Sequence, residues 1–231
     1  MPLSYTTVLL ATSEGPQPFA MSDAEALALN YAPPLLRNRF GGLFAMEARL
    51  RRYVAASREP LLTQIKIAWW REQISRVPVS PHEPEPLLGV LRSHWNEDLD
   101  VLADYVGSYE LLLADKPLRF ADSTVFSEQA GKVYASFGHI AEMGQFAEAA
   151  NRAGRIWATA WLMDNGHLRR DEPALLPLTD ETPGDLPRLP PALRSIAVLR
   201  ALGRRALVSG AGLLEGRLSA IVAFKAGLLG R

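Results

Sequence analysis

The sequence predicts an all-α protein with a single domain, and three observations support this. Apolar residues recur at spacings of three and four along almost the whole chain, which is the period of a helix with one buried face. Alternating runs of β-branched residues, which are typical of strands, are scarce. No repeat of 20–50 residues is present, and the proline-rich stretches separate helices of similar composition. We therefore expect residues 1–20 to be an N-terminal extension and residues 21–231 to be one helical domain.

The first part of the chain predicts three helices. Ser22-Asp23-Ala24-Glu25 has the pattern of a capping box, so a short helix begins there and ends at Pro33-Pro34. A second helix should cover residues 34–56, and its expected buried residues are Leu36, Phe40, Leu43, Phe44, Leu50 and Val54. A third helix follows Pro60 and ends before the prolines of residues 78–86. Its expected inward residues are Leu62, Ile65, Ala68, Trp69 and Ile74.

The rest of the chain predicts further helices. A short segment at residues 87–95 precedes a helix at residues 97–114, and a long helix is expected from residue 123 to about residue 148. Its buried stripe should contain Phe126, Ala130, Val133, Tyr134, Phe137 and Ile140. Another helix, at residues 151–165, should bury Ile156, Trp157, Ala160 and Trp161. Residues 171–191 predict a long loop rich in Pro and Asp, and residues 192–230 predict a helical hairpin or one long helix.

Composition excludes several classes of protein. The 231 residues contain 25 Lys and Arg against 25 Asp and Glu, so a protein whose main partner is a nucleic-acid backbone is not expected. The absence of cysteine excludes a disulfide scaffold, a thiolate zinc site and a cysteine nucleophile. No secretory signal and no transmembrane segment are visible, because charged residues interrupt the apolar tail. We expect a cytoplasmic protein, and peripheral contact with a membrane stays open.

Arginine is concentrated on the predicted second helix, at positions 37, 39, 49, 51 and 52. The guanidinium group binds phosphate or carboxylate through several donors, so this set could hold an anionic ligand. The alternative, which the general placement of charge runs favours, is a solvated face whose arginines pair with Glu47 and other acids.

For the other candidate residues, a structural role in the core or on the surface is the alternative to a role in binding. Trp69 and Trp70 must point about 100° apart on a helix, so one can fill the core while the other faces a groove. Trp157 and Trp161 share a face that could line either a core or an apolar channel. Asp100 and Asp104 lie one turn apart, where a surface helix start is favoured over a metal site. The four histidines are isolated, and no Gly-x-Ser-x-Gly or phosphate-binding glycine loop is present, so no metal ligand is assigned.

Three segments in this order resemble the squalene/phytoene synthase family. Residues 32–46, APPLLRNRFGGLFAM, are similar to the family's opening helix, and residues 67–74, IAWWREQI, to its next helix with Trp before a basic residue. Residues 154–177 look like the late segment, in which a helix of small residues reaches an Asp-rich motif and then Leu-Pro. The similarity covers residues 23–177. It implies a single-domain isoprenoid-synthase-like helical bundle around an apolar cavity, in which two Asp-rich motifs hold Mg²⁺ on prenyl diphosphates that are joined head to head.

The sequence departs from this pattern at the metal motifs. The two aspartates of the first motif correspond to Arg51 and Ala55, and neither residue can bind Mg²⁺. In the second motif Asp164 is retained, but no other acid follows where the family has one. The chain therefore looks closer to the branch of the family that lacks intact motifs, which includes a mitochondrial complex I assembly factor.

Two functional hypotheses follow from the resemblance. In the first, the protein is non-catalytic or altered and binds a prenyl or lipid-like ligand or a protein partner, with no cofactor. In the second, it is an active prenyl-diphosphate transferase in which arginines hold the diphosphate, with Mg²⁺ as the family's cofactor. A helical scaffold without a small-molecule site, its centre filled by aromatic side chains, is a third possibility. The residues expected to contact a ligand are Arg37, Arg39, Arg51, Trp70, Arg71, Tyr134, Trp157, Trp161 and Asp164.

Overall fold

The computed structural model describes residues 21–76, 85–140, 142–172 and 187–230. All regular structure in these ranges is helical, which confirms the all-α prediction. The α-helices are α1 (Asp23–Leu29), α2 (Pro34–Ala55), α3 (Pro60–Ser75), α4 (Pro86–Trp95), α5 (Leu99–Ser108), α6 (Phe120–Ile140), α7 (Ala147–Asp164), α9 (Arg194–Ser209) and α10 (Arg217–Leu229). Short 3₁₀ helices lie between them: η1 (Asn96–Asp98), η2 (Tyr109–Leu113), η3 (Gly144–Phe146) and η5 (Pro191–Leu193).

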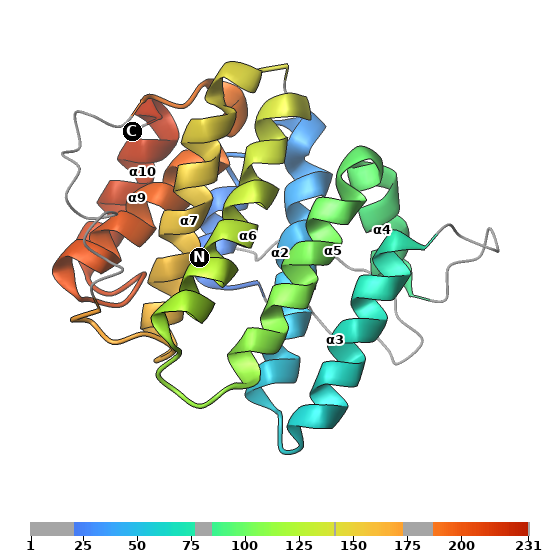
Figure 1. Ribbon diagram of the computed structural model, residues 1–231. Coiled ribbons are helices and arrows are strands. Elements are labelled where there is room, and N and C mark those ends of the chain that lie inside the picture. The colour runs from blue at the N-terminus through green and yellow to red at the C-terminus, as the bar shows by residue number, and fades with distance from the viewer. Residues whose placement is uncertain (1–20, 77–84, 141, 173–186, 231) are drawn as a thin grey trace, which may run out of the picture.

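The helices pack side by side in a row (Figure 1). The antiparallel pair α6 and α7 lies at the centre, α9 and α10 continue the row on one side, and α5 and α3 continue it on the other. α2 packs on α4, and α1 packs on α9. No helix in the described ranges combines the length and the hydropathy needed to cross a membrane.

Aromatic side chains fill the middle of the bundle. Phe40 of α2 stacks on Phe137 of α6 with 3.9 Å between ring centroids, and Trp95 meets Phe137 edge to face. Trp70, Trp157 and the tyrosines at positions 105, 109 and 134 are also fully buried. The apolar cavity that the resemblance implies is not confirmed along this part of the bundle.

The helix expected from residue 123 to about residue 148 ends earlier than predicted, and the next helix, expected at residues 151–165, begins earlier, at Ala147. α6 ends at Ile140, and Glu142 adopts a positive φ of 55° as the chain turns back. A Cβ atom on Gly138 would lie 3.2 Å from the backbone of Ala147, so the missing side chain lets α7 begin against the end of α6. The periodicity continues through the turn, which is why the sequence pattern did not show it. Residues 192–230, for which the sequence left a hairpin and one long helix open, form the hairpin of α9 and α10.

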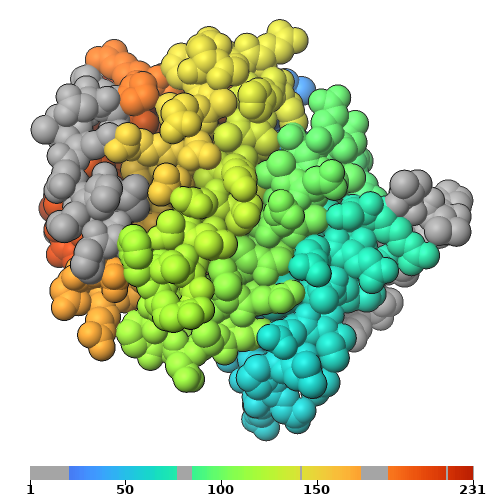
Figure 2. Space-filling view, viewed as in Figure 1, coloured from blue at the N-terminus to red at the C-terminus, as the bar shows by residue number. Residues whose placement is uncertain are grey.

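The buried face of α3 also differs from the expectation. α3 buries Thr63, Ile67, Trp70 and Ile74, whereas Leu62, Ile65 and Trp69 are exposed. Apolar residues cover both faces of this helix, so the pattern alone could not decide which face meets α5 and α2. The space-filling view shows α3 at an outer edge of the molecule (Figure 2). The exposed residues Leu62, Ile65 and Trp69 therefore face away from the bundle.

Candidate functional site

A pocket of about 510 Å³ lies where the C-terminal ends of α2 and α7 meet the start of α1 and the end of η2. Its exposed residues include Arg52, Lys116 and Asn165, whereas Trp161 and His167 are buried, so the pocket runs inward from the surface. The lining contains basic and apolar side chains and no carboxylate. It consists of Ser22, Ala48, Arg51, Arg52, Val54, Ala55, Leu112, Lys116, Trp161, Asn165 and His167.

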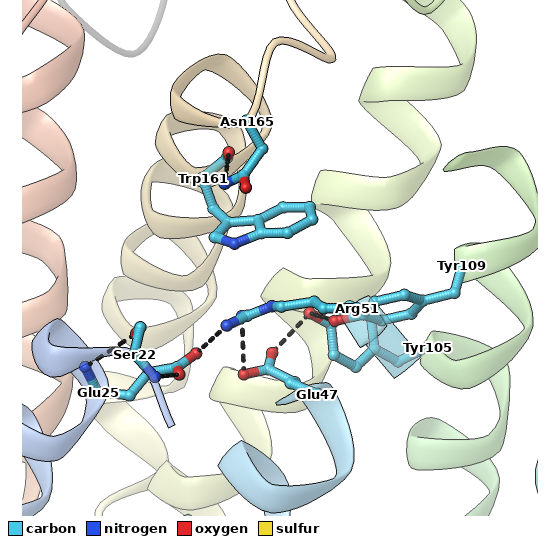
Figure 3. Close-up of polar contacts among 8 residues, drawn as sticks. All are labelled: Ser22, Glu25, Glu47, Arg51, Tyr105, Tyr109, Trp161 and Asn165. Carbon is cyan, nitrogen blue, oxygen red and sulfur yellow. Dashed lines mark hydrogen bonds and ion pairs between the residues drawn. The ribbon is translucent and has the colours of Figure 1, made fainter. Parts of the chain in front are cut away.

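Arg51 forms the inner wall of the pocket and is held by two buried carboxyl groups (Figure 3). Its Nη1 donates to Glu25 Oε1 at 2.6 Å, and its Nη2 donates to Glu47 Oε2 at 3.2 Å. The Tyr105 hydroxyl donates to the other oxygen of Glu47 at 2.6 Å. The hydroxyls of Tyr105 and Tyr109 are 3.4 Å apart. Arg51 therefore belongs to a polar network that is built into the core.

The predicted capping box of α1 is present and connects this network to the first helix. The Glu25 backbone N–H donates to Ser22 Oγ at 3.3 Å, and the Ser22 backbone N–H donates to Glu25 Oε2 at 2.9 Å. The same Glu25 side chain uses its second oxygen for Arg51. One carboxylate thus caps α1 and ties it to α2, which holds the start of α1 at the edge of the pocket.

The network contains two carboxyl groups and one guanidinium group, and this imbalance sets its protonation. Burial, and then repulsion from Glu25, raises the pKa of Glu47 to about 8, although the charge of Arg51 acts in the opposite direction. Burial opposes the charge on Arg51, yet Glu25 and Glu47 hold the pKa of Arg51 well above its usual value. At neutral pH Glu47 therefore keeps its proton.

Trp161 lines the pocket next to Arg51 and also contacts His167. The guanidinium carbon of Arg51 lies 4.8 Å from the centroid of the Trp161 ring, within cation–π distance. The His167 ring stacks on Trp161 with a centroid distance of 5.7 Å. Burial, and then the charge of Lys116, lowers the pKa of His167 to about 4, so this imidazole is neutral at neutral pH. Its buried Nδ1 has no hydrogen-bond partner within the described ranges.

The structure does not bring the predicted arginines together. Arg37 is exposed near the start of α2, and the 1.5 Å rise per residue places it roughly 20 Å along the helix from Arg51. Arg39 is buried, stacks 3.6 Å from the Trp95 ring and donates to Asp98 at 2.5 Å. Arg49 pairs with Glu85. The interpretation of a solvated arginine face fits Arg37 and Arg52, which are exposed. The other three are buried or half-buried, and each pairs with an acid from another part of the chain, although Arg51 also pairs with Glu47 of its own helix as expected.

The other predicted ligand contacts are also dispersed. Arg71 is exposed on α3, and Trp70, Tyr134 and Trp157 are buried in the core outside the pocket lining. Asp164 is exposed at the end of α7 and faces Gly212 instead of the pocket, because a Cβ atom on that glycine would lie 3.2 Å from the Asp164 carboxylate. Of the nine predicted residues, Arg51 and Trp161 line the pocket.

Several residues of the site were not among those predicted from the sequence. Lys116 and His167 line the pocket, and Glu25 and Glu47 hold Arg51. The four-residue spacing of Glu47 and Arg51 was the one local signal, and it indicated an ion pair on the surface rather than in the core. Lys116 reaches the pocket from the loop after η2, where its Nζ donates to the carbonyl of Asn165 at 3.1 Å. No sequence spacing could have shown that contact.

Some of the positions that the resemblance assigns to the metal motifs line this pocket. Arg51 and Ala55 of the first motif line it from α2, and Asn165 and His167, which follow Asp164 in the second, line it from the end of α7. Cationic, aliphatic, aromatic and amide side chains are a poor donor set for Mg²⁺, which prefers carboxylates. The nearby carboxyl groups of Glu25 and Glu47 are already bound to Arg51. In the described parts of the chain, no group of three or more His, Asp or Glu side chains is placed to hold a metal ion. The residues present therefore do not fit the metal.

Comparison with protein-family profiles, with curated proteins and with solved structures gave no match to this chain.

Proposed function

We propose that this protein is a non-catalytic member of the squalene/phytoene synthase type that binds an anionic, lipid-like ligand, such as a prenyl diphosphate, in the pocket between α2 and α7. The single observation that carries the proposal is the position and chemistry of the pocket. Both segments that the resemblance assigns to the metal motifs contribute to its lining, and the first supplies Arg51 and Ala55 where the family supplies carboxylates. A cytoplasmic location belongs to the same proposal.

The pocket lining matches a ligand with a charged head and an apolar body. Arg52 and Lys116 are exposed at its mouth, where they can bind phosphate oxygens. Leu112, Val54 and Trp161 offer apolar surface beside them. Because no carboxylate lines the pocket, an anion meets no like charge there.

Arg51 supports binding without catalysis. Its Nη1 and Nη2 atoms donate to Glu25 and Glu47, so they are not free to neutralise a leaving diphosphate. Arg37 and Arg39, the other arginines of the transferase hypothesis, lie outside the pocket lining. The geometry therefore favours ligand binding over the active transferase. The assembly-factor alternative rests on the resemblance alone.

The binding site can be tested by calorimetric titration with farnesyl diphosphate in the presence of EDTA. We expect binding by the unaltered protein and about tenfold weaker binding by Arg52→Ala and by Lys116→Gln, because each variant loses a charged contact to the diphosphate. Arg37→Ala is the matched control: it removes an exposed arginine from the same helix, outside the pocket, and should bind normally. Equal affinities for all four proteins, or no binding by any of them, would reject the site.

The absence of catalysis needs a separate assay. Incubation with farnesyl or geranylgeranyl diphosphate and Mg²⁺ should give no coupled product. Sustained formation of squalene or phytoene would contradict the non-catalytic role and would support the transferase hypothesis.

A further inference from the structure

α10 buries small residues and exposes its large apolar side chains, which is the reverse of the usual pattern for a helix of a bundle. Its inward residues are the small Ser219, Ala223, Ala226 and Gly227. Its outward apolar residues, which we call the α10 face, are 44–65% exposed. They are Leu218, Ile221, Phe224, Leu228 and Leu229.

Close packing explains the small residues on the inner side. A Cβ atom on Gly227 would lie 2.2 Å from the ring of Tyr31, so this side of α10 has no room for a larger residue. The folded domain thus gives no reason for the large apolar residues of the α10 face. A contiguous exposed apolar surface of this kind marks a site that another apolar surface covers.

The charge around α10 indicates what covers the α10 face. Residues 187–230 contain seven of the 25 basic residues of the chain and one of its 25 acidic residues, so the remainder of the chain is acidic. Lys225 is exposed within the α10 face, next to Phe224. Arg188 is also exposed. It lies near the end of α10, because the backbone N–H of the neighbouring Leu189 donates to the carbonyl of Gly230. Apolar side chains flanked by cations are typical of helices that lie in the surface of an anionic membrane.

We propose that the α10 face lies on an anionic lipid surface, with Phe224 and Leu228 among the acyl chains and with Lys225 and Arg188 at the headgroups. α10 lies at the opposite edge of the bundle from α3, so it can meet a flat surface while the rest of the molecule stays in water (Figure 1). A second copy of the chain is a poorer partner. A two-fold interface through this face would bring two basic hairpins together, with Lys225 of each copy in the contact. This surface is independent of the pocket between α2 and α7.

Co-sedimentation of the full chain with vesicles tests the proposal. We expect binding to vesicles of phosphatidylcholine and phosphatidylglycerol that weakens as salt is raised, and weaker binding to phosphatidylcholine alone. The double variant Phe224→Ser, Leu228→Ser should partition at least about tenfold less, because it removes two inserted apolar side chains. Ile65→Ser with Trp69→Ser is the matched control, since both side chains are similarly exposed on α3 at the far edge of the molecule. It should bind as the unaltered protein does.

Three outcomes would overturn the proposal. They are no binding to anionic vesicles, equal losses in the α10 and α3 double variants, and an α10 double variant that dissociates a dimer in sedimentation velocity but leaves vesicle binding unchanged. Arg52→Ala, which alters the pocket only, should bind vesicles normally, so failure of the pocket hypothesis and failure of this one can be told apart.

Discussion

At the scale of single residues, Arg51 of α2 is bound by two carboxyl groups that are fully buried. A buried ion pair is not strong support for stability, because both charges lose their hydration, but leaving one partner unpaired is very costly. Here two buried carboxyl groups depend on one guanidinium group, and the raised pKa of Glu47 relieves the excess negative charge. The network therefore links folding to pH.

Glu47 should lower the stability of the protein as pH rises from about 4.5 to about 8, whereas His167, which stays neutral in the folded protein down to about pH 4, raises it up to about pH 6.5. The net fall is therefore expected between about pH 6.5 and pH 8. In this window folded Glu47, with a pKa of about 8, keeps a proton that the unfolded chain, with the ordinary value of 4.5, has lost. The free energy of unfolding then decreases by up to about 1.4 kcal/mol per pH unit from this one group, and the decrease stops above its folded pKa. Glu47→Gln keeps an uncharged group of the same shape and should remove this slope. Urea unfolding at a series of pH values measures it.

The exposed Glu148 provides the control for this measurement. Glu148→Gln should keep the slope of the unaltered protein. A Glu47→Gln profile parallel to that of the unaltered protein would show that Glu47 is ionised in the folded state across the whole window.

At the scale of helices, glycines set how closely α6 and α7 approach. A Cβ atom on Gly154 of α7 would lie 2.7 Å from the ring of Tyr134 on α6. A Cβ atom on Gly131 of α6 would lie 3.0 Å from the backbone of Asn151 on α7. Both contacts are tighter than real Cβ atoms tolerate without movement, so this interface depends on the two missing side chains.

Gly154→Ala should lower the free energy of unfolding by about 1–3 kcal/mol, because the added methyl group forces Tyr134 and α6 to move. Gly41→Ala is the matched variant in α2, where an added Cβ atom would meet nothing within 4 Å. It should raise the free energy of unfolding by about 0.5–1 kcal/mol, since alanine is the better helix former. Chemical denaturation of both variants tests the pair. An increase in the free energy of unfolding of the Gly154→Ala protein would contradict the close contact between Gly154 of α7 and Tyr134 of α6.

Element boundaries and faces differ in how far the sequence could predict them. The capping box at Ser22 and the proline that begins α3 were both predicted, because each signal acts within a turn or two of the chain. For residues 192–230 the sequence left a hairpin and one long helix open, and the structure has the hairpin. The turn at Glu142 was missed, because the apolar period runs through it. The face of α3 was assigned wrongly, because Ile65 and Ile67 are equally apolar and only the neighbouring helices distinguish them.

At the scale of the whole molecule, the buried apolar residues form one continuous cluster from Ala24 in α1 to Ala226 in α10. The pocket opens at the edge of this cluster, since Leu112 and Trp161 belong to both, and the α10 face lies outside it; both have basic side chains beside them. The balanced formal charge of the chain conceals this segregation, since residues 187–230 are strongly basic and the rest is acidic.

Because the core is continuous, we expect residues 21–231 to unfold as one domain in a single transition. Far-ultraviolet circular dichroism reports the helices, and tryptophan fluorescence reports the buried Trp70, Trp95 and Trp157. The two signals should change together over the same range of denaturant. Two separated transitions would show that the chain contains more than one folding unit.

By itself, the sequence determined the all-helical class, most helix boundaries and the arginine-rich character of α2, since helical periodicity, caps and prolines are local signals. Only the tertiary structure decided which arginines are buried, that Glu25 of α1 and Glu47 of α2 share Arg51, and that Lys116 reaches the end of α7. It also decided that α10 packs through its small residues and presents its large ones outward. These features depend on contacts between residues that are distant in the chain, and periodicity does not specify the partner of a helix face.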